Sequence, residues 1–141
     1  MIISVYPFID PKVHYDAQTF AGKVVLITGA SRGIGLETTL HFARAGASLT
    51  IVARTQLALD ATKDTILRAR PSAQVLTFPA DVRDVKKAEE AVAATVAHFG
   101  RLDILVANAA ILRASFQRAY PSSVLSRACG NRRTADLRPN H

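Results

Sequence analysis

The chain has 141 residues, of which 49% are hydrophobic and 21% charged, a composition typical of one globular domain and unlike that of a disordered chain. No apolar run approaches the roughly 18 residues that cross a bilayer, and the N-terminus lacks the basic segment of a signal peptide, so we expect no membrane partner and a cytoplasmic location. The net charge is +7, but six of the 18 basic residues and only one of the 11 acidic residues lie in 112–141, so the basicity belongs to the tail and we expect no nucleic-acid partner.

The first 20 residues contain two prolines and mix polar with apolar side chains, which predicts an N-terminal extension lying on or beside the domain. From Lys23 onward, short β-branched runs alternate with segments of helical period. Strands are predicted at 23–29, 48–54, 74–80 and 102–110. Their near-continuous apolar content is typical of a parallel sheet covered on both faces.

Helices are predicted between these strands. The first runs from about residue 33 to 45 and stops at Gly46, where a left-handed residue can end a helix. The second follows Thr55, a candidate N-cap, places Leu59 and Ile66 on one face and ends before a proline.

The third predicted helix follows Asp84, another candidate N-cap, and stops at Gly100. An apolar face at spacings of three and four is predicted from Val85, Ala88, Val92, Val96 and Phe99. The alternation of strands and helices predicts an α/β fold, a Rossmann-like doubly wound parallel sheet with right-handed crossovers, truncated after the fourth strand.

The stretch TGASRGIG, residues 28–35, joins the first strand to the first helix. Gly29 permits a sharp turn out of the strand, Gly33 leaves room for a pyrophosphate near the backbone, and Gly35 lets the helix pack closely on the sheet. The helix N-terminus then favours phosphate charge. The alternative is a tight turn that holds no ligand, but the flanking strand and helix favour a dinucleotide site.

The end of the second strand indicates which dinucleotide is bound. NAD sites usually place a carboxylate there for the ribose 2′-hydroxyl, whereas this chain has Ala53 followed by Arg54. With Arg32 in the glycine loop, two guanidinium groups can meet a 2′-phosphate, so NADP(H) is favoured over NAD(H). The alternative is that Arg54 is a solvated surface residue.

Three motifs in this order, TGASRGIG (28–35), ADV (80–82) and NAA (108–110), resemble those of the short-chain dehydrogenase/reductase family. The resemblance covers residues 21–111, which we interpret as an NAD(P)-binding Rossmann half-domain. It implies hydride transfer between a nicotinamide and a carbonyl or alcohol carbon.

The resemblance also implies roles for single residues. Ser31, Arg32 and Ile34 would line the phosphate and ribose side of the cofactor. Asp81 would accept a hydrogen bond from the adenine amino group beside the Val82 backbone, although it could instead be a turn or capping residue. The third motif, Asn108, Ala109 and Ala110, would lie beside the cofactor ribose, with alanine where the family commonly has glycine.

The family's catalytic tyrosine and lysine, spaced Tyr-x-x-x-Lys, have no counterpart in this chain, so no catalytic residue is assigned. Tyr120 is followed four positions later by Val124, and it lies too close to Asn108 for another helix and strand to intervene. Residues 112–141 hold six arginines without a sustained period and are predicted to be an irregular tail unlike the family.

Neither metal binding nor thiol chemistry is expected. The four histidines are scattered without ligand spacing, and the single Cys129 has no activating partner in the pattern, which predicts an inert thiol.

Three interpretations remain open. The chain is the NADP(H)-binding portion of an oxidoreductase, inactive by itself and able to use a small carbonyl or alcohol substrate only if the missing half is supplied. Alternatively, it is a non-catalytic NADP(H)-binding interaction module, or a truncated or mispredicted gene product. In each case the apolar fourth strand would be an exposed edge through which the chain is expected to self-associate.

Overall fold

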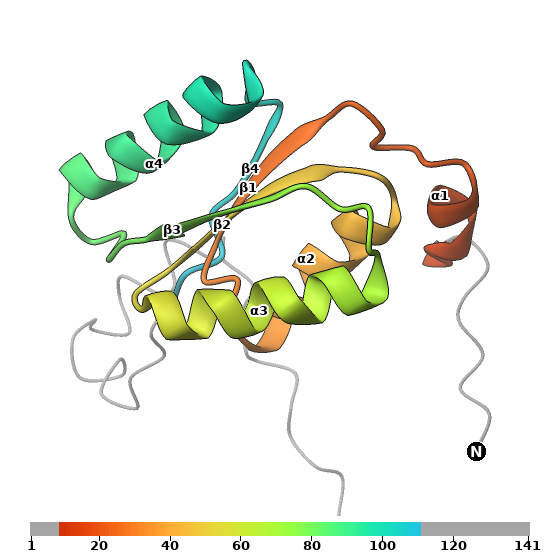
Figure 1. The fold of residues 1–141 in the computed structure, drawn as a ribbon, viewed down its shortest axis with the longest axis horizontal. Helices are drawn as coiled ribbons and strands as arrows, with labels where there is room; N and C mark the ends of the chain where they lie inside the picture. Colours follow the sequence, from red (N-terminus) through yellow and green to blue (C-terminus); the bar gives the residue numbers. More distant parts are fainter. Residues whose placement is uncertain (1–8, 111–141) are drawn as a thin grey trace, which may run out of the picture. The chain divides into compact units, whose positions relative to one another are not determined.

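The computed structural model describes residues 9–110 (Figure 1). Its sheet has four parallel strands, β1 (Val24–Thr28), β2 (Ser48–Ala53), β3 (Val75–Pro79) and β4 (Ile104–Val106), in the order β3-β2-β1-β4. The helices are α1 (Lys12–Asp16), α2 (Gly33–Arg44), α3 (Gln56–Ala69) and α4 (Val85–Phe99). Figure 1 shows α4 on one face of the sheet and α2 and α3 on the other, which confirms the predicted doubly wound, Rossmann-like sheet.

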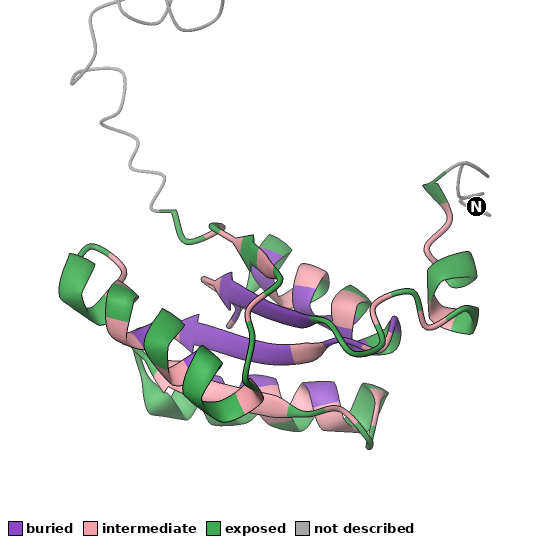
Figure 2. Cartoon of the chain, turned by 90° about the horizontal axis from the view of Figure 1, so that it is seen from above, coloured by how far each residue is buried: buried purple, intermediate pink, exposed green. Residues whose placement is uncertain are grey.

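The two central strands, β1 and β2, are mostly apolar because both of their faces are covered. Val25 and Ile27 face a cluster that includes Leu59 and Ile66 of α3, whereas Leu26, between them, faces Ala91 of α4. Successive side chains of a strand point to opposite faces, so a doubly covered strand has no polar side. Figure 2 shows the resulting buried centre of the sheet between more exposed helices.

Local signals set the helix ends where the sequence predicts them. The Thr55 hydroxyl accepts a hydrogen bond from the Ala58 N–H at 3.4 Å and caps α3. The Asp84 carboxylate accepts from the first turn of α4, and Gly100 ends that helix with a φ of +79°. Gly46, with a φ of +98°, follows the end of α2.

The predicted apolar face of α4 is wrong. Val85, Val92 and Val96 are 70%, 37% and 43% exposed, whereas Ala91 and Thr95 are buried against the sheet. Small side chains let the helix backbone approach the strands closely, and the larger valines are left on the outer side. The fourth strand is also shorter than the predicted 102–110, because beyond Val106 the backbone turns to contact Thr28 and no longer pairs with β1.

The described part of the N-terminal segment lies against α2. The Phe20 N–H donates to the Ala45 carbonyl at 2.9 Å, and the Phe20 ring meets Phe42 edge-to-face. The Tyr15 hydroxyl contacts His41 Nδ1. Residues 1–8, the predicted tail 112–141, Cys129 and Tyr120 lie outside the described residues.

Candidate functional site

The carboxyl ends of the strands meet at one edge of the sheet. In the register, Thr28 pairs with Val52, Val52 pairs with Phe78, and Ile27 pairs with Val106. The segments that follow all four strands therefore leave from the same edge, which is where open α/β sheets bind ligands.

The glycine loop after β1 depends on glycine at three positions for two different reasons. Gly29 and Gly33 have φ values of +66° and +57°, in the left-handed region that side chains disfavour. At Gly35 the obstacle is space: an added Cβ would lie 2.0 Å from the Gly29 carbonyl oxygen and 2.5 Å from Asn108 Nδ2. Gly35 thus lets α2 start directly against the loop.

Asn108 ties this loop to the end of β4. Its amide nitrogen Nδ2 donates to the carbonyls of Thr28 and Gly29 at 3.3 and 3.2 Å. In return, the Thr28 hydroxyl oxygen accepts from the backbone N–H groups of Asn108 and Ala109, both at 3.1 Å. Sequence reasoning assigned Asn108 and Ala109 to the site but not Thr28, although Thr28 is the one hydroxyl in an otherwise apolar strand.

The N-terminus of α2 has no cap of its own. Arg32 occupies the N-cap position with an extended backbone, no side-chain hydrogen bond caps the helix within the described residues, and the first turn contains no acidic residue. The helices α3 and α4 begin at the same edge but are capped by Thr55 and Asp84. The unpaired N–H groups of α2 therefore favour an anion from outside the chain.

Several predicted residues border this helix start. Arg32 is exposed, Ser31 is half-buried, and Ile34 is 78% exposed. Ala110, the last described residue, is exposed.

Arg54 and Asp81 follow β2 and β3 at this edge. Arg54 is exposed, and the Asp81 side chain is partly exposed while it pairs with Arg83 at 2.5 Å. The pKa of Asp81 is lowered to about 2, chiefly by the hydrogen bond from the Arg83 side chain, with a smaller contribution from the charge of Arg54. Val82 turns the other way and packs against the core cluster beneath the sheet edge.

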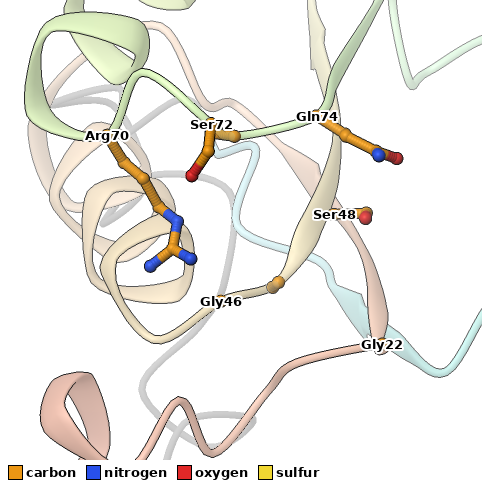
Figure 3. Close-up of a pocket in the computed structure, with 8 residues that line it drawn as sticks. Gly22, Gly46, Ser48, Arg70, Ser72 and Gln74 are labelled. Carbon is orange, nitrogen blue, oxygen red and sulfur yellow. The ribbon is translucent and has the colours of Figure 1, made fainter.

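A polar cavity of about 350 Å³ lies at the opposite edge of the sheet (Figure 3). It is lined by the segments that precede β1, β2 and β3, and Figure 3 shows Arg70, Ser72 and Gln74 on the segment before β3. Because ligands of such sheets bind at the carboxyl ends, this cavity is separate from the candidate site.

Within residues 9–110, no helix is long and apolar enough to span a membrane. The same residues bring together no group of three or more His, Cys, Asp or Glu side chains that could hold a metal ion.

Comparison with known proteins agrees with this geometry. The family model described as short chain dehydrogenase matches residues 23–129. An 11-beta-hydroxysteroid dehydrogenase-like 2 from Arabidopsis thaliana is 40% identical over 98 residues, which cover 70% of this chain and 32% of that protein. The chain spans about a third of the length of such curated relatives.

Two solved structures share the fold. L-sorbose reductase from Gluconobacter frateurii, complexed with NADPH and L-sorbose, is 30% identical with a TM-score of 0.66, over 74% of this chain and 40% of that one. Carveol dehydrogenase from Mycobacterium avium, in complex with NAD, is 33% identical with a TM-score of 0.59, over 64% and 36% of the two chains. Proteins similar to this chain therefore bind either dinucleotide.

Proposed function

The chain belongs to the short-chain dehydrogenase/reductase family, and we propose that it is the NADP(H)-binding portion of an oxidoreductase of that family, inactive as this chain alone. The observation that carries the proposal is the loop at the carboxyl edge of β1. There Gly35 has no room for a Cβ, Asn108 fixes the loop, and no side chain among residues 9–110 caps the start of α2. These features fit a pyrophosphate.

The preference for NADP(H) rests on charge. Arg54, directly after β2, occupies the place where a carboxylate would meet the 2′-hydroxyl of NAD(H), and Arg32 is exposed at the start of α2. A guanidinium group can bind a phosphate through two parallel hydrogen bonds. The similar proteins bind either cofactor, so the two arginines are the argument for the phosphorylated one.

The remaining site residues are proposed to surround the cofactor. Gly29 and Gly33 shape the loop, and Ser31 and Ile34 border the phosphates and ribose. Asp81 and the Val82 backbone would contact the adenine. Asn108, Ala109 and Ala110 would lie beside the ribose.

A bound nicotinamide supplies a hydride donor or acceptor for a carbonyl or alcohol carbon. The chain's own residues bind and orient the cofactor. With no Tyr-x-x-x-Lys in the sequence, the chain has no proton donor of the kind that the family uses. The purified chain should therefore oxidise no NADPH with any ketone in a test panel, and steady turnover would contradict the proposed inactivity.

Thermal unfolding with each cofactor tests the binding proposal. NADPH at about 100 times its Kd should add about 2.7 kcal/mol to the free energy of unfolding, and NADH much less. The variant Arg54→Asp should lose the effect of NADPH and gain one from NADH. Arg101→Ala, at the opposite edge of the sheet, is the control, and each cofactor should shift its transition as much as it shifts that of the wild type.

Equal stabilisation of the wild type by NADH and NADPH would contradict the NADP(H) preference. A cooperative transition that neither cofactor moves would contradict binding itself. The absence of any cooperative transition, with or without cofactor, would favour the alternative of a truncated or mispredicted product.

We further propose that the chain self-associates through β4. On one side β4 pairs with β1, and within the described residues no strand pairs with its other side. Leu105, whose side chain lies on one face of β4, is 57% exposed. An apolar strand edge invites pairing with another chain. The variant Leu105→Lys should lower the weight-average molar mass measured by sedimentation equilibrium. A monomeric wild type would overturn the proposal.

A further inference from the structure

The carboxylate of Asp81 is held by the residue two positions later. The backbone N–H of Arg83 donates to Asp81 Oδ1 at 3.0 Å. The Arg83 side chain adds Nε, 3.0 Å from both carboxylate oxygens, and Nη2, 2.5 Å from Oδ2. One arginine thus fixes both the turn and the direction of the carboxylate.

This pair lies at the candidate site and remains open to a ligand. Asp81 follows β3 after Ala80, whose N–H donates to the Ala53 carbonyl at 2.8 Å and so continues the sheet pairing up to the site edge. The Asp81 side chain is 36% exposed, so the carboxylate is not enclosed by the protein. The carboxylate is ionised at neutral pH, and because Arg83 lowers the pKa of Asp81 to about 2 it stays ionised well into acid.

An ionised carboxylate accepts hydrogen bonds and cannot donate one. It therefore attracts the exocyclic amino group of an adenine and repels the carbonyl oxygen that hypoxanthine carries at the same ring position. How well it discriminates depends on how firmly the carboxylate is aimed, because a freely rotating side chain can turn away from an unsuitable base.

We propose that Arg83 is a positioning residue that holds the Asp81 carboxylate toward the adenine ring, so that the pair selects adenine over a base with a carbonyl at that position. This inference rests on the proposed NADP(H) site. Arg83 itself acts on the ligand only through Asp81.

The structure permits a variant that isolates this role. Arg83→Ala removes the guanidinium contacts but keeps the backbone N–H that donates to Oδ1, so the turn before α4 is retained. The Arg83 side chain is 68% exposed, and its loss removes little packing. The matched control is Arg101→Ala, which removes an arginine paired at 2.6 Å with Asp103, also two residues away, before β4 at the opposite edge.

The measurement is the ratio of Kd values for NADPH and for its hypoxanthine analogue, taken by calorimetry on the full 141-residue chain. Both ligands carry the same phosphates, so the ratio reports the base alone. The wild type should bind NADPH about tenfold more tightly than the analogue. Arg83→Ala should reduce the preference to about threefold or less, Arg83→Lys should give an intermediate value, and Arg101→Ala should keep the wild-type ratio.

Asp81→Ala separates the possible failures. If Asp81→Ala abolishes the preference for NADPH while Arg83→Ala keeps it, Asp81 selects the base without help from Arg83. The inference is then overturned. If both variants keep the preference, Asp81 does not set it, and the inference fails although NADPH binding stands. If the wild type binds neither ligand, the proposed function and the inference fail together.

Discussion

Replacing Gly35 by alanine should destabilise the fold, although alanine is the better helix former. The new Cβ would lie 2.0 Å from the Gly29 carbonyl oxygen and 2.5 Å from Asn108 Nδ2, and a backbone carbonyl cannot rotate away as a side chain can. Overpacking of this kind costs about 1–3 kcal/mol. Displacing Asn108 would also break its two hydrogen bonds to Thr28 and Gly29, worth about 0.5–1.5 kcal/mol each. Alanine returns about 1 kcal/mol of helix propensity, so the net loss is about 3 kcal/mol.

Urea unfolding followed by far-ultraviolet circular dichroism measures this loss as a fall in the transition midpoint. The matched control is Gly33→Ala in the same loop, where an added Cβ meets nothing within 4 Å and only the φ of +57° opposes it. That strain costs about 1–2 kcal/mol. If Gly35→Ala were as stable as Gly33→Ala, the argument from the close contact would be refuted.

Three further predictions concern groups away from the loop. Asp84→Ala removes the N-cap of α4 and should cost about 1 kcal/mol in urea unfolding. Thr95→Val should cost about 1–3 kcal/mol, because the buried Thr50 hydroxyl loses its partner at 3.0 Å, and adding Thr50→Val should recover part of the loss. The pKa of Asp103 is lowered, chiefly by Arg101, so its contribution to stability is present above the ordinary value of 3.8 and is lost as pH falls through the lowered pKa. Asp103→Asn should therefore be less stable than the wild type at pH 7, with the difference shrinking in acid.

Each of these has a distinct contrary result. An Asp84→Asn variant no more stable than Asp84→Ala would mean that the side-chain oxygen is not the capping group. A double threonine variant that loses the sum of two single losses would show that the hydroxyls do not act as a pair. A difference between Asp103→Asn and the wild type that grows as the pH falls would contradict the sign of the pKa shift.

The sequence predicts the elements well where the signal is local. Thr55, Asp84, Gly46 and Gly100 each end or begin a helix through their own side chain or backbone freedom, which does not depend on the rest of the fold. The predicted sheet-facing side of α4 is wrong because the spacing of apolar residues alone cannot tell which of two apolar rows on the helix packs against the sheet. The row that includes Ala91 and Thr95 has the smaller side chains and is the buried one.

The sequence motifs pick out candidate site residues but do not predict the contacts between them. The motifs pick out Gly35, Asn108 and Asp81, yet the bonds of Asn108 to Thr28 cross 80 positions of the chain, and only the folded sheet brings them together. Arg83 is missed for a different reason. Its contact with Asp81 is an exposed ion pair within one turn, which no motif or periodicity in the sequence marks.

The hydrogen bonds between Thr28 and Asn108 also determine when the glycine loop can form during translation. The ribosome adds about 5–20 residues per second, so Asn108 follows Thr28 by roughly 4–16 s. During that interval the glycine loop lacks the side chain that holds it, and pairing β1 with β4 must first close a long chain segment at an entropic cost. A nascent chain therefore cannot present the finished loop to a dinucleotide, and cofactor binding can stabilise the protein only after β4 has docked.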